Sequence, residues 1–309
     1  AARLGEGALQ DKSRLMLIEM ALNDDDDERL LELVDNLMGS VSGQGSVKTR
    51  YALGKALIRL NRYQPAVAML SGLVNDPSWG DKARFYVATA HTALKRYDEA
   101  LREFEKLAQN SDSDSTDLRD LSQLAIGRLK MEQGDLAGAV ISYQQIARTS
   151  NQFEVALYEM SWGYIKGEQY DKALASIDTL LLIVKNPILD VEAHGLRGRL
   201  NIYLNDYDRA VTSFEEIVGR FAPIRNELLA FAAEEGSVTR YFEWLLERRA
   251  SDARLDAPLT ARTAAWVESS GDMRRVAGVF DSLSDQRRQI RLTQEIAAEL
   301  EQIVRAQNR

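Results

Sequence analysis

The chain has 309 residues, carries a formal net charge of −8 and contains no cysteine. This length exceeds what one ordinary compact core needs, so we expect either two domains or an elongated array whose units pack only on their neighbours. The missing cysteines exclude disulfides, thiolate zinc sites and cysteine nucleophiles, and the acidic balance argues against nucleic acid as the main ligand.

The composition favours helix along the whole chain. Prolines are few, five in all, and Ala, Leu, Glu and Arg are abundant. The most apolar run, residues 179–184, is far shorter than the roughly 20 residues that a membrane-spanning helix needs, so we expect no transmembrane segment. The chain begins with AARLGEG, without an initiator Met or a charged-then-apolar leader, and this start leaves an upstream signal peptide open.

Residues 1–46 are expected to form a degenerate helix pair and a flexible connector. Apolar residues three and four apart predict two helices, over 8–23 and 28–39, on either side of NDDDDE. The four aspartates of that stretch then lie at the start of the second helix, where free N–H groups and the helix dipole favour carboxylates.

The connector, residues 39–49, contains a glycine-rich stretch before a lysine. A phosphate-binding loop would need Gly where Val47 stands, a different spacing of the first Gly and a buried strand before it. We therefore interpret this segment as a linker to the next helix.

An aromatic or leucine residue followed three positions later by alanine recurs five times between residues 47 and 223. The intervals between the recurrences are 34, 39, 34 and 37 residues. A period near this length is typical of repeated helix pairs. The five residues are Tyr63, Tyr97, Leu136, Tyr170 and Tyr207, with alanines at Ala66, Ala100, Ala139, Ala173 and Ala210.

Other positions of the same register repeat equally well. Nine residues before each of these five positions stands a small residue, and seven and ten residues after it stands a large apolar or aromatic one. Two antiparallel helices per unit explain this pattern, because small residues let the helices approach and the bulky ones fill the remaining space. The small residues are Gly54, Ala88, Gly127, Ser161 and Gly198; the bulky ones are Leu70, Leu73, Phe104, Leu107, Tyr143, Ile146, Ile177, Leu180, Phe214 and Ile217.

The pattern resembles the tetratricopeptide repeat (TPR) superfamily over residues 47–223. The resemblance implies an all-α solenoid of five helix pairs, coiled into a right-handed superhelix whose concave groove is lined by the first helix of each pair. One departure is clear, since the large aromatic residue often found early in the first helix is replaced in every repeat. The replacing residues are Arg50, Arg84, Gln123, Leu157 and His194.

The repeats contain partial matches to enzyme and metal-binding motifs, but each match lacks required residues or structural context. Residues 112–116 match the spacing of an aspartyl-phosphate motif but follow no apolar strand. As a calcium loop the same region lacks its central Gly and its final Glu, so we expect a solvated insertion and no metal or cofactor. His91 and His194 fall in different repeats, and no Ser/His/Asp arrangement suggests itself, so we expect no enzyme.

Residues 224–309 are expected to form degenerate helix pairs and a final helix. The segments IRNELLAFAAEE and VTRYFEWLLERR predict one pair after Pro223, and residues 259–283 predict another. The last helix, roughly 284–307, carries Leu292, Ile296, Leu300 and Ile303 on one stripe. Capping the end of the array is our preferred role for it, and binding a partner helix is the alternative.

The resemblance also implies which residues face the groove. Projecting the family's groove positions onto the five first helices selects seven Lys or Arg, five aromatic and two acidic side chains, the reverse of the chain's overall charge balance. The cationic and aromatic positions are Lys48, Tyr51, Lys55, Arg59, Lys82, Phe85, Arg128, Tyr158, Trp162, Lys166, Arg199 and Tyr203.

A basic, aromatic-lined groove suits an acidic or amphipathic peptide or protein segment. The clamp by which some TPR proteins grip chaperone C-termini is not matched, because Lys55 and Tyr86 stand where Asn is expected and Leu121 where Lys is expected. Nucleic acid in the groove is disfavoured by the acidic exterior.

The helical tail with YFEWLLERR is similar to TPR components of bacterial envelope assemblies, including gliding-motility complexes. The resemblance therefore implies a periplasmic, non-enzymatic scaffold, and the alternative is a cytoplasmic peptide-sensing or regulatory TPR protein. A secretory leader or lipidation cysteine upstream of Ala1 would separate the two.

Overall fold

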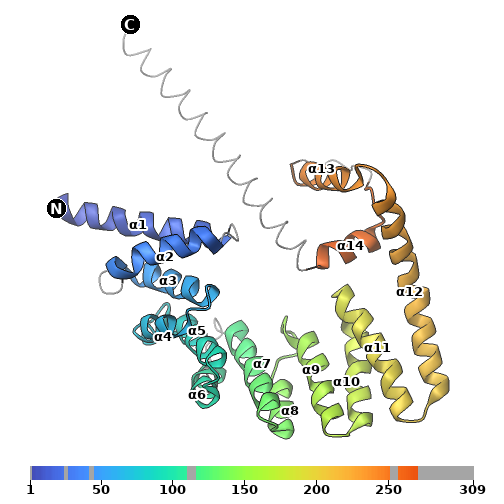
Figure 1. Cartoon of the computed structure of the whole chain (residues 1–309). Coiled ribbons are helices and arrows are strands. Elements are labelled where there is room, and N and C mark those ends of the chain that lie inside the picture. Colours follow the sequence, from blue (N-terminus) through green and yellow to red (C-terminus); the bar gives the residue numbers. More distant parts are fainter. Residues whose placement is uncertain (1, 24–26, 42–44, 110–115, 251–256, 271–309) are drawn as a thin grey trace. The chain divides into compact units, whose positions relative to one another are not determined.

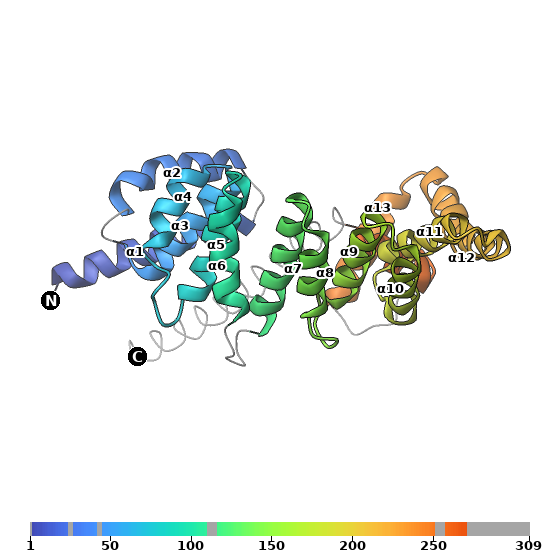
Figure 2. The ribbon, with the colours of Figure 1, turned by 90° about the horizontal axis from the view of Figure 1, so that it is seen from below.

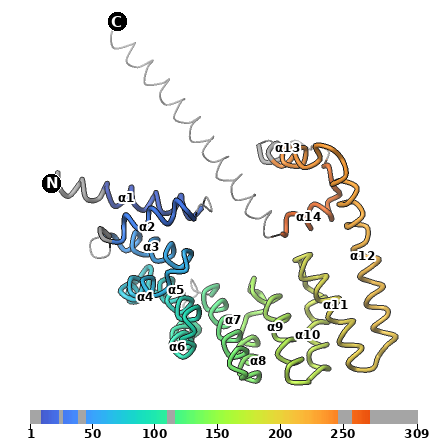
Figure 3. The backbone as a smooth tube through the Cα atoms, in the orientation of Figure 1, coloured from blue at the N-terminus to red at the C-terminus, as the bar shows by residue number. Residues whose placement is uncertain are grey.

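The structure is a computed structural model of the chain, and it describes residues 2–23, 27–41, 45–109, 116–250 and 257–270 (Figures 1 and 3). Within these ranges the regular structure consists of fourteen α-helices and contains no strand. The all-α fold class is therefore confirmed. The chain divides into two compact units, the first made of residues 1–184 and 196–210 and the second of residues 185–195 and 211–309. The three domains expected from the sequence stay a prediction.

The first unit is a succession of helix pairs. Its N-terminal pair is α1 (Ala2–Asn23) and α2 (Asp27–Val41), which pack on each other and on α3. The repeated pairs are α3 (Val47–Arg59) with α4 (Tyr63–Ser71), α5 (Gly80–Ala93) with α6 (Tyr97–Ala108), α7 (Thr116–Glu132) with α8 (Leu136–Gln144), and α9 (Phe153–Lys166) with α10 (Tyr170–Ile183).

The pairs stack so that each contacts the next. The second helix of one pair packs on the first helix of the following pair, as α4 does on α5, α6 on α7 and α8 on α9. The first helices α3, α5 and α7 also contact one another in sequence. Figure 2 shows α3 to α6 side by side. This arrangement confirms the solenoid packing predicted from the repeat.

The same turn joins the two helices of all five pairs. The residue two positions before each repeat Tyr or Leu has positive φ, and in the first pair it is Asn61 at 58°. The next residue donates its backbone N–H to a carbonyl five residues earlier, as Arg62 does to Leu57 at 2.8 Å. This is the hydrogen-bond pattern of a Schellman C-terminus, which reverses the chain in few residues. The other four positive-φ residues are Lys95, Gly134, Glu168 and Asn205.

Small residues on the first helices allow the second helices to approach, as the sequence predicted. A Cβ added to Gly54 would overlap the Leu70 side chain, and one added to Gly127 would overlap the Tyr143 ring. The five recurring alanines and the five small residues are all buried. The bulky positions are buried in the first four pairs, and in the fifth Phe214 is 37% exposed.

Polar contacts support the N-terminal part of the first unit. Ser46 precedes α3 and accepts a hydrogen bond from the Thr49 backbone N–H, at 3.2 Å. Its own backbone N–H donates to the Asp11 carboxylate of α1, at 3.1 Å. The end of the predicted connector therefore caps α3 and ties it to α1. Residues 39–41 of the predicted connector form the end of α2 and residues 47–49 begin α3, so both ends of it are helical; residues 42–44 lie outside the described residues. Residues 110–115, which hold most of the insertion predicted as a solvated loop, also lie outside them.

The second unit begins within α11 (Pro187–Tyr203) and continues through α12 (Tyr207–Ala233), α13 (Ser237–Ala250) and α14 (Ala261–Ser269). The sequence suggested a new helix after Pro223, but Pro223 lies inside the 27-residue α12. A proline inside a helix removes one N–H donor and crowds the carbonyl four residues earlier. Here that carbonyl belongs to Gly219, whose Cβ position faces open space.

Helices α12, α13 and α14 pack around aromatic residues. The Phe221 ring of α12 lies 5.7 Å from the Trp266 ring of α14, and Tyr241 of α13 packs near Phe231 and Trp244. The Glu227 carboxylate accepts hydrogen bonds from the Thr260 backbone N–H at 2.6 Å and from its hydroxyl at 2.7 Å, at the start of α14. The predicted C-terminal helix with its apolar stripe lies outside the described residues.

Candidate protein-binding surface

The candidate site is the surface of the first helices of the repeats, α3, α5, α7 and α9 together with the C-terminal half of α11, here called the first-helix surface. All twelve side chains predicted to line the groove lie on these helices, and none of them is buried. The exposed ones are Lys48, Lys82, Arg128, Lys166, Arg199 and Tyr203; the half-buried ones are Tyr51, Lys55, Arg59, Phe85, Tyr158 and Trp162. Their role in binding stays a prediction.

Three aromatic rings and two lysines meet where α3 contacts α5, and we call this group the aromatic–lysine cluster. The Tyr51 ring lies 4.8 Å from the Trp79 ring and 5.7 Å from the Tyr86 ring, measured between centroids. The Nζ of Lys55 is 5.9 Å from the Tyr86 centroid, and the Nζ of Lys82 is 5.1 Å from the Trp79 centroid. These distances allow cation–π attraction, which holds both lysines on the aromatic surface.

Two members of the cluster were missed by sequence reasoning. Trp79 lies just before α5, in the loop that follows the preceding pair, so it has no place in the helical register. Tyr86 follows Phe85 on α5, at a position that the projected groove does not include. A chain-wide count of aromatics flanking the first helices could have found both.

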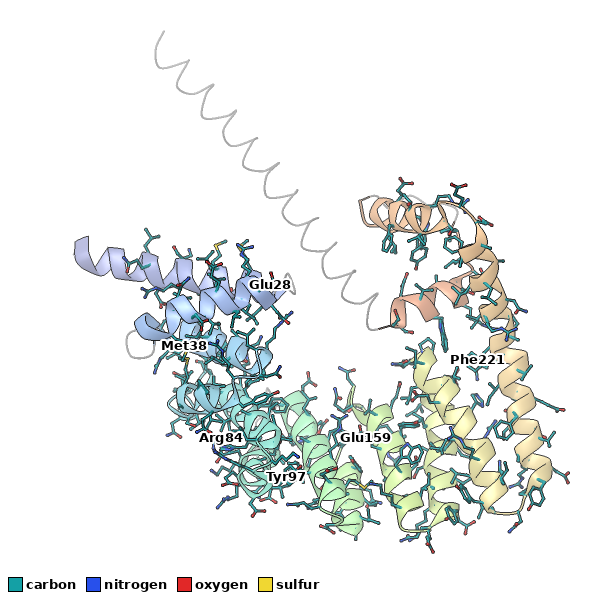
Figure 4. The ribbon with its side chains drawn as sticks, viewed as in Figure 1. Glu28, Met38, Arg84, Tyr97, Glu159 and Phe221 are labelled. Carbon is teal, nitrogen blue, oxygen red and sulfur yellow. The ribbon has the colours of Figure 1, made fainter. Side chains whose placement is uncertain are left out.

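The two arginines Arg59 and Arg128 are already paired within the chain. Arg59 donates to the Asp27 carboxylate of α2 at 2.6 Å and to the Leu22 carbonyl at 2.9 Å. Arg128 of α7 donates to the carboxylate of Glu159 on α9, which is labelled in Figure 4, through Nε at 2.9 Å and a terminal nitrogen at 2.5 Å. Pairing reduces the charge that either arginine offers to a ligand. The net positive field predicted for the surface therefore rests more on its lysines.

Glu159 also connects Arg128 to a buried tyrosine of α8. The Tyr143 ring is 3% exposed. Burial raises the pKa of Tyr143 well above its usual range, and the negative charge of Glu159 and a hydrogen bond to it add to the effect. Glu159 thus joins three helices, α7, α8 and α9, at one point of the first-helix surface.

Further along the chain the surface carries two aromatic pairs. Tyr158 and Trp162 stand one turn apart on α9 with ring centroids 6.3 Å apart, in an edge-to-face arrangement. Tyr203 of α11 stacks on Tyr170 of α10, with centroids 4.9 Å apart and planes at 5°. Tyr203 remains 59% exposed, so it presents one side of a stacked pair to solvent.

Part of the chain matches a known family of helical repeats. Residues 51–115, which contain α4, α5 and α6 and most of α3, match the tetratricopeptide repeat family. This segment is of the tetratricopeptide repeat type. Repeats of this family bind other proteins in many settings, and this supports a protein-interaction scaffold as the general role.

Solved structures similar to part of this chain include structures of MamA and one of TPR-like repeats. A structure of MamA is 11% identical, covering 57% of this chain and 92% of its own, with a TM-score of 0.47. MamA from Desulfovibrio magneticus RS-1 is 15% identical, covering 56% and 93%, with a TM-score of 0.42. TPR-like repeats of a Podosopora anserina protein named as a kinesin light chain are 15% identical, covering 58% and 96%, with a TM-score of 0.47. No curated protein gave a match to this chain.

No group of three or more His, Cys, Asp or Glu side chains in the described part of the chain could hold a metal ion. No helix among the described residues is both long and apolar enough to cross a membrane. The two histidines lie on different first helices, His91 on α5 and His194 on α11, as the register predicted.

Proposed function

We propose that this chain is a non-enzymatic scaffold that binds an acidic, partly apolar protein segment along its first-helix surface, as part of a bacterial envelope complex. The observation that carries the proposal is the aromatic–lysine cluster, which combines rigid apolar area with two cations where α3 meets α5. Tyr and Trp lose little conformational entropy on binding and are enriched among the residues that dominate binding energy.

The charges on this surface favour an acidic ligand. Lys82 is exposed and Lys55 half-buried, and each ammonium group stands over an aromatic ring with other hydrogen-bonding directions open to an incoming carboxylate. Arg59 and Arg128 contribute less, because Asp27 and Glu159 compensate them. An extended segment with alternating acidic and apolar residues would place carboxylates on the lysines and apolar groups on the rings.

The test is capture of partners from a lysate of the native cell by the wild type and by Lys55→Glu/Lys82→Glu. Charge reversal at both lysines should reduce capture of the partner by at least about tenfold, since each charged contact at an interface contributes on the order of 1 kcal/mol or more. Arg128→Glu is a poor probe, because it would set two carboxylates against each other at Glu159.

A matched control is Lys12→Glu/Lys95→Glu, which changes the net charge equally. Lys12 is exposed on α1 and Lys95 is exposed in the turn between α5 and α6, and neither is one of the twelve predicted groove residues. Equal capture by both double variants would show only a general charge effect. Undiminished capture by Lys55→Glu/Lys82→Glu would refute binding at the aromatic–lysine cluster.

The envelope location is supported by the similarity of the YFEWLLERR segment, which lies on α13. It is tested by fractionating cells that express the complete gene with a C-terminal tag. Recovery in the periplasmic or membrane fraction is expected. Recovery in the cytoplasm alone would favour a cytoplasmic peptide-sensing TPR protein instead.

A further inference from the structure

A polar pocket lies on the second repeat, away from the first-helix surface. Its volume is about 600 Å³, and the residues that line it come from the end of α4 and the segment after it, from α5 and from α6. Around α5, the lining residues Arg84, Val87 and His91 point about 150° away from the predicted groove positions, at 100° per residue. The pocket therefore belongs to a different face of the array from the aromatic–lysine cluster.

The pocket arises from two unusual residues of the repeat. Arg84 stands at a position where the family often has a large aromatic residue, and His91 stands seven residues later, where the family pattern has Tyr. In the fourth repeat the same two positions hold Leu157 and Tyr164, which supply apolar bulk. Replacing such a pair by a cation and an imidazole makes this cavity polar.

Arg84 is fixed at the wall of the pocket by two partners. It donates to the Glu103 carboxylate of α6 at 2.6 Å and to the Val74 carbonyl at 3.1 Å (Figure 4). Lys106 also donates to Glu103, at 2.6 Å. These hydrogen bonds lower the pKa of Glu103 against the opposing effect of its burial, so Glu103 is ionised and compensates part of the cationic wall.

Arg102 keeps hydrogen-bond donors for a ligand, whereas one ring nitrogen of His91 is unpaired but buried. Arg102 is exposed and donates its Nε to the Asp98 carbonyl of its own helix, at 3.2 Å; its terminal nitrogens make no hydrogen bond to the described residues. The Nδ1 of His91 is buried and has no hydrogen-bond partner among the described residues. Burial lowers the pKa of His91, with Arg96 and Arg102 adding to the effect and Glu99 and Glu103 opposing it, so its imidazole is neutral at pH 7.

The net charge of the side chains that line the pocket favours a singly charged anion. Arg84, Arg102 and Lys106 exceed Glu99 and Glu103 by one positive charge, with His91 neutral. A carboxylate balances this excess, whereas a phosphate dianion would leave net negative charge beside two glutamates. The planar fork of an arginine also matches a carboxylate in a two-point contact.

We propose that this pocket binds a carboxylate group, held by Arg102 and Lys106 at the rim with the imidazole of His91 at its base. Its volume is that of a small-ligand site, so either an acidic side chain of a protein segment or a free monocarboxylate can enter. The site is separate from the first-helix surface and gives the scaffold a second binding function.

The test follows the two histidines by NMR while propionate, or an acetylated and amidated peptide with a single glutamate, is added to the full chain. Because a nearby anion favours imidazolium, either probe that binds should shift the His91 resonance saturably and raise its pKa, with His194 as an internal reference. Tighter binding of the peptide would identify a protein segment as the source, and tighter binding of propionate a small molecule. Inorganic phosphate should bind at least tenfold more weakly than either.

Substitutions at Arg102 and Arg84, with a matched control at Arg148, make the result decisive. Arg102→Gln should weaken binding of the better probe about tenfold or more, and Arg102→Lys should weaken it less, since a charged hydrogen bond is lost in the first and kept in the second. Arg148→Gln, an exposed arginine after α8 with the same charge change, should have no effect. Arg84→Leu, which introduces the residue of the fourth repeat and keeps the His91 signal, should abolish the saturable shift, because it removes the positive excess of the pocket. Absence of a saturable His91 shift, or equal binding by Arg102→Gln and Arg148→Gln, would overturn the proposal.

Discussion

At the scale of single residues, the five repeat turns share one backbone conformation but differ in sequence. The positive-φ position holds Gly only once, at Gly134, and the others hold Asn61, Lys95, Glu168 and Asn205. Asn tolerates this left-handed conformation better than Lys or Glu, because its short side chain can bond locally. The hydroxyls of Tyr63 and Tyr207 donate to the Asn61 and Asn205 side chains, which gives those two turns extra support.

Lys95→Gly should therefore stabilise the protein. Lys95 is exposed and its φ is 58°, so the substitution removes backbone strain and loses little side-chain contact. We expect the free energy of unfolding to rise by about 1 kcal/mol, measured by urea denaturation. Gly134→Ala is the converse test, because φ at Gly134 is 82°, and it should lower stability by a similar amount. A loss of stability in Lys95→Gly would mean that the turn carries no strain.

Close helix approach at single glycines gives a second prediction. A Cβ at Gly127 would overlap the Tyr143 ring, which is 3% exposed and bonded to Glu159, so the ring has little room to move. Gly127→Ala should therefore reduce the free energy of unfolding by about 1–3 kcal/mol. Gly219→Ala, in α12 with nothing within 4 Å of the added Cβ, should instead raise it by about 0.5–1 kcal/mol. Similar effects of the two substitutions would contradict the close packing.

At the scale of helices, contacts between neighbouring pairs depend on polar groups as well as on the apolar register. Arg128 of α7, Tyr143 of α8 and Glu159 of α9 form one network, and Arg84 and Glu103 join α5 to α6. Burial keeps the Tyr143 hydroxyl protonated, so the stability of these helix contacts depends on pH.

The stability of the first unit should fall as pH rises above about 10, where tyrosine ionises in the unfolded chain. Burial raises the pKa of Tyr143 and of Tyr51, so the folded state keeps protons that the unfolded state releases. Below that pH the hydrogen bond to Glu159 makes the wild type more stable than Tyr143→Phe. Above it, this advantage should shrink by up to about 1.4 kcal/mol per pH unit, measured by urea denaturation from pH 8 upward. An advantage that stays constant over this range would argue against the raised pKa.

The helix pairs could be predicted from the sequence because five repeats report the same packing. One alignment of Gly127 with Gly54, and of Tyr143 with Leu70, predicts contacts that the structure confirms. A feature that occurs in a single repeat has no counterpart in the other repeats, so the repeat pattern could not predict it. Trp79 joins the aromatic–lysine cluster from a loop. Glu159, which belongs to the next helix pair, neutralises Arg128. Helix α12 continues through Pro223 because its packing through Phe221 and Ile224 outweighs one lost hydrogen bond.

At the scale of the whole molecule, the first unit is held together by contacts between near neighbours. The helix pairs in contact are adjacent or next to adjacent along the chain, with α1·α3, α3·α5 and α5·α7 the most widely separated among the substantial contacts. The stability of such an array is approximately a sum of terms for each repeat and each interface between repeats. A local defect should therefore loosen its own repeat and the next one more than distant repeats.

Phe104→Ala tests this expectation. Phe104 is 2% exposed and packs between α5 and α7, beside Phe85, Ala88 and Leu129. Removing the ring should cost about 3–5 kcal/mol at that site. Hydrogen exchange measured by mass spectrometry should then accelerate most in peptides from α5, α6 and α7, and less in those from α1, α2 and α10. A uniform acceleration over all helices of the first unit would mean that it unfolds as one cooperative body, and binding at one repeat could then be felt by all the others.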